Sequence, residues 1–354
     1  MQSLTVSKRS GAKASKFKVT FLGGGSFGTA MANLAAINGA RSTLWVRSSR
    51  TVKQMTSSRY NKKYLPDFRL SDNLSFSSDI EEAVRGRDII FVAVPSHAFR
   101  GVLQSIAPFI TSQAIVSLTK GMEKESLKLM SEVIQEELPN VAYGVISGPN
   151  LAKEIMGQMP SATVIASTSE ALREAVAQVL NSALFRVFPS DDVPGVELGG
   201  ALKNIYAIAM GMASAHDVGE NTKSMLLTLA LSEMSRLGAA MGARPMTFLG
   251  LSGVGDLFAT CSSELSRNFR MGKMLGEGSS VKKASKKLGQ TSEGVNTIEQ
   301  VRQKAQELGV DMPITDAMYE IIFEEKPPLA AAFELLNAGA TDHFDFQLAA
   351  PERT

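Results

Sequence analysis

The sequence predicts an α/β domain with a doubly wound, mostly parallel sheet, followed by an all-α domain. Three observations favour this fold class. The length of 354 residues suits about two domains, each able to bury a core. From residue 17 to about residue 190, short β-rich runs alternate with helical patterns, which is typical of a parallel sheet covered by helices. After residue 200 the β-rich runs stop and helical patterns follow.

Eight short runs rich in β-branched and aromatic residues are the expected strands. In chain order they are KVTFLG, STLWV, LSFSS, DIIFVAV, AIVSL, YGVIS, ATVIA and FRVF. Between the last two runs, apolar residues recur at steps of three and four, so we expect a crossover helix packed on the sheet. Its apolar stripe consists of Ala171, Leu172, Ala175, Val176, Val179, Leu180 and Leu184.

Turn-forming residues gather at positions 191–200, DDVPGVELGG, and we place the domain boundary there. Five later runs rich in Ala, Leu, Met and Glu predict helices. They are IYAIAMGMASA, SMLLTLALSEMSRLGAAMG, NTIEQVRQKAQELG, ITDAMYEIIFEE and LAAAFELL. We therefore expect a sheet domain at 17–190 and a helical domain at 191–345. They are flanked by a flexible basic tail at 1–16, or a remnant of organelle targeting, and a C-terminal tail at 346–354.

The composition excludes several functional classes. Lys and Arg number 37 against 35 Asp and Glu, and this balance argues against a nucleic-acid partner. The most apolar helical run is far shorter than the about 20 residues that cross a bilayer, so no membrane span is expected. The single cysteine, Cys261, favours a reducing, cytoplasmic location. His97, His216 and His343 lack metal-ligand spacing, so we predict no metal.

A glycine-rich turn follows the first expected strand. Gly23, Gly25 and Gly28 fit the pattern G-x-G-x-x-G, the fingerprint of Rossmann-like dinucleotide-binding domains. The first glycine allows a tight turn, the second lets the backbone approach a pyrophosphate, and the third lets the helix pack on the strand. Because a strand precedes the turn and a helical pattern follows it, we interpret residues 17–190 as a dinucleotide-binding domain.

Basic residues follow the second expected strand. Arg47 lies 19 positions after Gly28, in LWVRSSR, with Arg50 nearby and no carboxylate in that stretch. An acidic residue at this distance would hold the ribose of NAD, whereas an arginine accommodates the 2′-phosphate of NADP. We expect NADP to be accepted; the alternative is that both arginines are solvated loop residues.

Two lysines are candidates for the chemistry. Lys203 lies in ELGGALKNIYAIAMG among apolar and small residues, so its ammonium either reaches solvent or is held for a reaction. Lys120 follows the AIVSL run, and ligands of open α/β sheets bind at the carboxyl ends of strands. An ordinary loop lysine is the alternative for Lys120.

A short stretch between glycines gathers further polar candidates: Asp256, Thr260, Ser266, Arg267 and Asn268. The planar fork of Arg267 suits a phosphate, and Ser266 and Asn268 add neutral donors. Alternatively, Ser266 caps a helix and Arg267 faces solvent.

Nine ordered motifs carry a family resemblance: GGGSFGTAMA, VPSH, TKGME, ISGPN, GGALKN, EMSRLGAAMGA, GLSGVGDLFATCSS, SRN and SEGVNT. From about Lys18 to about Gly339 they resemble bacterial-type NAD(P)-dependent glycerol-3-phosphate dehydrogenase. The resemblance implies a Rossmann-like domain followed by a helical substrate-binding domain like that of 6-phosphogluconate dehydrogenase. It implies NAD or NADP as cofactor and a phosphorylated triose or glycerol as substrate. Dihydroxyacetone phosphate would be reduced reversibly to sn-glycerol 3-phosphate, which supplies the glycerol backbone for phospholipid synthesis.

The resemblance also implies roles for individual residues. Lys203 matches the family's proton donor and acceptor, and we count Lys120 and Asp256 as catalytic with it. The positions assigned to the substrate pocket are Lys120, Gly148, Asn150, Lys203, Asn204, Asp256, Thr260, Ser266, Arg267 and Asn268. The positions assigned to the cofactor are Gly23, Gly25, Ser26, Phe27, Gly28, Arg47, Arg50, Lys120, Ala152, Arg267, Thr291 and Glu293.

Proton transfer by Lys203 requires a lowered pKa, because a free lysine near 10.4 rarely releases its proton at neutral pH. Burial and the neighbouring ammonium of Lys120 would lower this pKa, whereas Asp256 would raise it. The sequence does not decide which influence dominates.

The chain departs from the family pattern at several positions. Asn150 stands where Ser or Thr is usual, and we expect an altered contact there because an amide still donates and accepts. Leu229 replaces a frequent arginine, and Lys223 with Ser224 replaces Arg-Thr, so an anionic or subunit contact could be missing. Thr291 replaces a frequent valine, a change we do not interpret.

Two other functions stay open. A β-hydroxyacid or 6-phosphogluconate dehydrogenase usually has an asparagine four residues after the lysine, whereas here Asn204 is adjacent and position 207 is Ala207. A non-catalytic NADP-sensing module is the other alternative, although it would not need both a proton-transfer group and a phosphate-binding group. The preference between NAD and NADP, feedback regulation and the oligomeric state, a homodimer included, are not fixed by the sequence.

Overall fold

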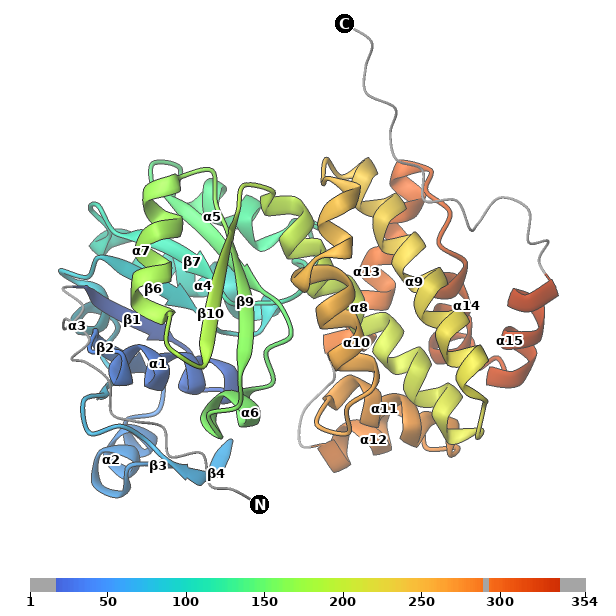
Figure 1. Ribbon diagram of the computed structural model, residues 1–354, viewed down its shortest axis with the longest axis horizontal. Coiled ribbons are helices and arrows are strands. Elements are labelled where there is room, and N and C mark those ends of the chain that lie inside the picture. The colour runs from blue at the N-terminus through green and yellow to red at the C-terminus, as the bar shows by residue number, and fades with distance from the viewer. Residues whose placement is uncertain (1–16, 289–292, 338–354) are drawn as a thin grey trace, which may run out of the picture.

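The first half of the chain forms one eight-stranded sheet (Figure 1). The computed structural model describes residues 17–288 and 293–337, so the expected tails at 1–16 and 346–354 lie outside it. From edge to edge the strands are β10 (Phe185–Ser190), β9 (Ser161–Ala166), β8 (Tyr143–Ser147), β7 (Ala114–Ser117), β6 (Ile89–Val92), β1 (Lys18–Leu22), β2 (Arg41–Trp45) and β5 (Ser75–Ser77). Each of the eight expected runs supplies one strand, which confirms this part of the prediction.

The sheet is mostly parallel, as predicted. From β5 to β8 all neighbouring strands are parallel, β9 runs antiparallel to β8, and β10 is parallel to β9. All four residues of β6 are buried, as expected for a central strand covered on both faces. The carboxyl ends of the parallel strands lie at one edge, and the glycine turn, Lys120 and Gly148 follow β1, β7 and β8 there.

Helices cover both faces of the sheet. They are α1 (Ser26–Ile37), α2 (Ser49–Ser58), α3 (Ile80–Val84), α4 (Ser96–Ile106), α5 (Met130–Glu137), α6 (Ala152–Met156) and α7 (Glu170–Leu180), with a 3₁₀ turn at Ala107–Phe109. Apolar residues of α1 and α7 share one core with the sheet, and those of α4 and α5 share another. This arrangement confirms the doubly wound fold.

Helix α7 is the predicted crossover between β9 and β10. Its buried residues are Leu172, Val176, Val179 and Leu180, which belong to the expected apolar stripe. Leu184 was wrongly included in that stripe: the helix ends at Leu180, and Leu184 is 41 % exposed.

A two-stranded hairpin, β3 (Tyr60–Asn61) and β4 (Leu65–Arg69), was not expected from the sequence. It lies between α2 and β5 in the chain and projects below the sheet in Figure 1. Most of β4 is exposed or half-buried, so its sequence lacks the apolar run that identified the other strands.

The second half of the described chain contains no strand and packs around one long helix. The helices are α8 (Val193–Ala215), α9 (Glu220–Ala240), α10 (Asp256–Cys261), α11 (Arg267–Gly276), α12 (Val281–Leu288), α13 (Glu293–Leu308), α14 (Pro313–Phe323) and α15 (Pro328–Asn337). A 3₁₀ turn at Pro245–Leu249 and a π-helical turn at Leu251–Gly255 precede α10. Figure 1 shows α8 between the sheet and the outer helices, and nearly all its residues are buried. Among the described helices, none has both the length and the apolarity to cross a membrane.

The interpretation of residues 191–200 as a turn-rich segment is wrong. Helix α8 begins at Val193, directly after Asp192, whose carboxylate accepts a hydrogen bond from the Gly195 amide at 3.1 Å. Gly199 and Gly200 lie inside this helix. Both positions require glycine because other elements approach them closely. A Cβ atom at Gly199 would lie 2.3 Å from the Ser252 carbonyl oxygen, and one at Gly200 would lie 2.3 Å from Ser147 Oγ.

Helices α8 and α11 also touch backbone to backbone. A Cβ atom at Gly272 would lie 1.9 Å from the Ile208 carbonyl oxygen, and one at Gly211 would lie 2.1 Å from that of Phe269. These two glycines therefore set the spacing between the helices that carry Lys203 and Arg267.

Candidate active site

The glycine turn after β1 forms a cradle at the start of α1. Gly23 has a φ of +125°, and a Cβ atom there would lie 2.3 Å from the Ala93 carbonyl oxygen. A Cβ atom at Gly28 would lie 2.2 Å from the Gly23 carbonyl oxygen, which packs helix against strand. Around Gly25, by contrast, nothing lies within 4 Å of the Cβ position. This open space beside the first-turn N–H groups of Ser26 and Phe27 fits a pyrophosphate.

Asn61 supports this cradle and was missed by sequence reasoning. Its amide nitrogen donates to the Gly24 carbonyl oxygen at 3.0 Å and to Thr29 Oγ1 at 2.9 Å. The residue is only 2 % exposed and comes from the unexpected hairpin strand β3. No motif identifies such a contact, because it depends on where the hairpin docks.

Arg47 and Arg50 lie close to the end of β2 and are both exposed. Arg50 belongs to the first turn of α2, which Ser48 caps by accepting a hydrogen bond from the Thr51 amide at 3.2 Å. Both guanidinium groups are thus accessible at the carboxyl end of a strand next to the glycine turn, where they could meet a 2′-phosphate.

Lys120, Lys203 and Asp256 meet in one buried cluster. The Asp256 carboxylate is 1 % exposed and accepts from Lys120 Nζ at 2.5 Å through Oδ2 and from Lys203 Nζ through Oδ1. Lys203 Nζ also donates to Thr260 Oγ1 at 2.8 Å, and Lys120 Nζ donates to the Gly148 carbonyl oxygen at 3.0 Å. Two ammonium groups therefore share one carboxylate at the meeting of sheet and helices.

Burial is the main influence on Lys203. It lowers the pKa of the Lys203 ammonium to about 8, and the positive charge of Lys120 acts in the same direction, while Asp256 opposes both. The neighbouring thiol of Cys261 has its pKa raised to about 12 by burial, so it stays neutral. An amine with a pKa near neutrality can both give and take a proton at physiological pH.

Gly148 and Asn150 line the loop after β8. Gly148 has a φ of +151° and directs its carbonyl oxygen to Lys120. The Asn150 amide donates to the Ala162 carbonyl oxygen at 2.9 Å and accepts from Thr163 Oγ1 at 2.8 Å, so it binds the loop to β9. Among the described contacts, one of the two amide hydrogens of Asn150 is used, in the bond to Ala162.

The start of α11 carries the other polar candidates. Ser266 caps the helix, accepting a hydrogen bond from the Phe269 amide at 3.2 Å, so the cap alternative describes its hydroxyl. Arg267 is exposed at the first position of the helix. Asn268 donates to Asn204 Oδ1 at 2.8 Å, which links the start of α11 to the residue next to Lys203.

Of the remaining candidate residues, some lie within the described residues and some outside them. Ala152 is half-buried and begins α6, close after Gly148. Glu293 begins α13, but its side chain and all of Thr291 lie outside the described residues. Leu229 packs against the helical core, and Lys223 pairs with Glu220 at 2.7 Å on α9. Among the residues that the structure describes, no three His, Cys, Asp or Glu side chains gather as metal ligands would.

Fold and site together define a class. A Rossmann-type sheet with an open glycine cradle at a helix N-terminus, next to a buried lysine–carboxylate cluster, is the arrangement of a dehydrogenase that uses a dinucleotide cofactor.

Comparison with known proteins gives the family. Residues 18–173 match the N-terminal profile of NAD-dependent glycerol-3-phosphate dehydrogenase, and residues 192–332 match its C-terminal profile. The chain belongs to this family. The match favours the family over the 6-phosphogluconate-type alternative, and it confirms the resemblance based on the nine motifs.

Individual relatives agree. Glycerol-3-phosphate dehydrogenase (NAD(P)+) of Psychrobacter cryohalolentis is 64 % identical over 94 % of this chain and 77 % of its own length. The protein of the same name from Acinetobacter baumannii is 62 % identical over 95 % of this chain and 94 % of its own. A solved structure of glycerol-3-phosphate dehydrogenase from Coxiella burnetii superposes with a TM-score of 0.87 and 37 % identity, covering 91 % of this chain and 99 % of that one.

Proposed function

We propose that this chain reversibly reduces dihydroxyacetone phosphate to sn-glycerol 3-phosphate with NADH or NADPH. The observation that carries this proposal is the buried cluster of Lys203, Asp256 and Lys120 beside the nucleotide-binding sheet. The nicotinamide, when bound, supplies and accepts the hydride. The residues of the chain bind, orient and move the proton.

Lys203 handles the proton at the C2 oxygen of the substrate. In the reductive direction its ammonium stabilises the charge that develops on this oxygen and then donates a proton, leaving a neutral amine. In the oxidative direction the amine takes the proton back. The lowered pKa of Lys203 makes both forms accessible near neutral pH.

Lys120 and Asp256 prepare Lys203 for this task. The Asp256 carboxylate orients the Lys203 amine through a charge-assisted hydrogen bond, and Thr260 accepts a second one. Lys120 pairs with the same carboxylate, and its positive charge lowers the pKa of Lys203. This limits the rise in the Lys203 pKa that Asp256 would otherwise cause.

The start of α11 binds the phosphate. Arg267 offers a guanidinium fork, Asn268 offers an amide, and the helix N-terminus capped by Ser266 adds a favourable dipole. Binding the phosphate, which does not react, would position the carbonyl at Lys203. Asn204 connects the two ends of the site through its bond with Asn268.

The cradle of Gly23, Gly25 and Gly28 would hold the pyrophosphate of the cofactor at the N-terminus of α1, and Arg47 with Arg50 would accommodate the 2′-phosphate of NADP. Residues 17–190 then form the dinucleotide-binding domain and residues 191–345 the substrate-binding domain, with Lys120, Gly148 and Asn150 of the first domain also at the substrate. A cytoplasmic location, a homodimeric assembly and a role in supplying glycerol 3-phosphate for phospholipids complete the proposal.

One spectrophotometric assay tests it. NADH or NADPH consumption is followed with dihydroxyacetone phosphate, and 6-phosphogluconate with NADP+ serves as the comparison substrate. We expect turnover with dihydroxyacetone phosphate for both cofactors. Tight NADPH binding without turnover would instead indicate a sensing module, and turnover confined to 6-phosphogluconate would indicate the sister class. Light scattering of the purified protein tests the dimer.

A further inference from the structure

We propose that Arg100 is a positioning residue that, through Glu123, fixes the loop carrying Lys120 against the buried carboxylate of Asp256. Arg100 lies on α4, and its hydrogen bonds in the described structure go to Glu123, Glu136 and Glu137, none of which is assigned to substrate or cofactor. The inference rests on the proposed function only in so far as it uses the proton-transfer role of Lys203.

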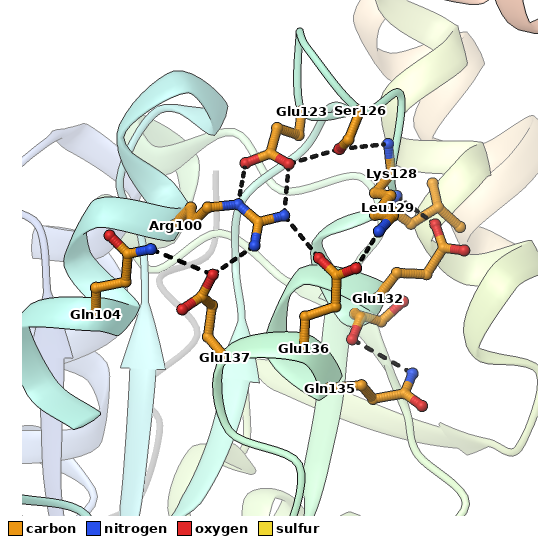
Figure 2. Close-up of polar contacts among 11 residues, drawn as sticks. Arg100, Gln104, Glu123, Ser126, Lys128, Leu129, Glu132, Gln135, Glu136 and Glu137 are labelled. Atoms are coloured by element: carbon orange, nitrogen blue, oxygen red, sulfur yellow. Dashed lines mark hydrogen bonds and ion pairs between the residues drawn. The ribbon is translucent and has the colours of Figure 1, made fainter. Parts of the chain in front are cut away.

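Arg100 joins three elements (Figure 2). Its Nε and Nη2 atoms donate to the two carboxylate oxygens of Glu123, both at 2.7 Å. Nη2 also donates to Glu136 at 2.7 Å, and Nη1 donates to Glu137, both on α5. We call these four residues the Arg100 hub. One cation thus holds three carboxylates, one of which belongs to the Lys120 loop.

Glu123 in turn shapes the loop between β7 and α5. Its carboxylate accepts from Ser126 Oγ at 2.5 Å, its amide donates to the Lys128 carbonyl oxygen at 2.9 Å, and its carbonyl accepts from the Leu127 amide at 3.0 Å. Lys120 lies only three residues earlier in the same loop. A displacement of Glu123 would therefore move the backbone from which Lys120 reaches Asp256.

The ion pair between Arg100 and Glu123 is partly buried and bidentate, so it can hold the loop in place. The Arg100 and Glu123 side chains are 28 % and 15 % exposed, and they pair in the two-pronged geometry that makes arginine–carboxylate contacts effective. Arginine also holds the pKa of Glu123 below its usual range. Without Arg100, the three carboxylates would face one another, and among the described residues Lys128 pairs with Glu136 alone of the three, so the loop would move away from α5.

Lys203 reports the position of the loop. The ionisable side chains that face it are Asp256, Lys120 and the neutral thiol of Cys261, with Thr260 as its uncharged partner. If Lys120 withdraws, Asp256 acts on Lys203 alone and the Lys203 pKa rises. Glycerol 3-phosphate oxidation requires the neutral amine of Lys203. The pH at which the oxidation rate increases therefore shifts upward.

The test compares Arg100→Ala, Arg100→Lys and Glu123→Gln with Glu137→Gln as a matched control. Glu137→Gln also neutralises a carboxylate on Arg100, but one that lies outside the loop. For Arg100→Ala we expect kcat to fall about tenfold, since small misplacements near the chemistry can cost up to 10²-fold, with the KM for NADP+ unchanged. The pH profile should shift upward in Arg100→Ala and, to a smaller extent, in Glu123→Gln. Arg100→Lys should restore part of both effects, and Glu137→Gln should resemble wild type.

An unchanged pH profile in Arg100→Ala, or equal effects of Glu123→Gln and Glu137→Gln, would overturn the inference. Hydrogen exchange of residues 118–129 gives a second readout that does not depend on turnover. Faster exchange in Arg100→Ala and Glu123→Gln than in Glu137→Gln supports the positioning role whether or not the protein oxidises glycerol 3-phosphate. Failure of the wild-type protein to oxidise glycerol 3-phosphate would contradict the proposed function alone. Equal exchange in all variants refutes the positioning role.

Discussion

Lys120 and Asp256 bind each other across the two halves of the molecule, with 2.5 Å between Nζ and Oδ2. Lys120 follows β7 of the sheet, and Asp256 begins α10 among the helices. The contact brings sheet and helices together at Lys203.

The pH dependence of turnover should report Lys203. Because burial lowers its pKa to about 8, the neutral amine predominates above that pH and the ammonium below it. Glycerol 3-phosphate oxidation should therefore rise with pH and level off above about 8, whereas dihydroxyacetone phosphate reduction should fall there. Steady-state kcat measured in both directions checks this. A rise in oxidation that continues to the ordinary lysine range near 10.4 would contradict it.

Arg267→Ala should weaken substrate binding. A hydrogen bond to a charged group contributes about 1.5–3 kcal/mol, so we expect the KM for dihydroxyacetone phosphate to rise by about ten- to a hundredfold. At saturating cofactor, the activity with phosphate-free dihydroxyacetone should stay the same, because this ketone has no phosphate for Arg267 to bind. Arg270→Ala, exposed on the same helix, is the control. An equal loss with the phosphate-free ketone would remove the assigned role.

Glu233→Gln should change how thermal stability depends on pH. Burial raises the pKa of Glu233 to about 7, and its carboxyl contacts Tyr206, Thr315 and the Ile314 amide. Between its unfolded value near 4.5 and 7 the folded state binds more protons, so this carboxyl's stabilisation is complete at low pH and lost as pH rises. The loss by pH 8 is about 3 kcal/mol. The Tm of Glu233→Gln relative to wild type should therefore increase from pH 5 to pH 8, and a constant difference would refute this.

Gly272→Ala should separate α8 from α11. Its Cβ would lie 1.9 Å from the Ile208 carbonyl oxygen, so we expect a loss of about 1–3 kcal/mol in the free energy of unfolding. We also expect a lower kcat, because Lys203 and the phosphate-binding end of α11 move apart. Gly101→Ala in α4, where nothing lies within 4 Å of the Cβ position, should be neutral or slightly stabilising. Equal stability of the two variants would contradict this prediction, because it would show that the helices accommodate the added methyl group without cost.

The sheet could be predicted from the sequence because its strands are short apolar runs between helical patterns. The hairpin that carries Asn61 could not, since most of β4 is exposed and lacks such a run. Residues 191–200 were misjudged for a related reason. Glycines 199 and 200 are explained by the approach of Ser252 and Ser147, which lie about 50 residues away in the chain.

The candidate site was only partly predictable. Motifs pointed to Lys120, Lys203 and Asp256, which the structure brings together, but not to one carboxylate that holds both ammonium groups. The pKa of Lys203 depends on how deeply the packing around α8 buries it relative to the charges of Asp256 and Lys120, and the sequence does not show this packing. Arg100 and Asn61 carry no motif, because their contacts arise only when distant elements meet.

The Lys203→Ala variant tests the central claim most directly. General acid–base groups contribute about 10²–10⁴-fold, so kcat for dihydroxyacetone phosphate reduction should fall about a hundredfold or more. NADPH affinity, measured by fluorescence titration, should stay nearly unchanged, and Lys273→Ala on the surface of α11 should behave as wild type. Near-normal turnover in Lys203→Ala would contradict the account.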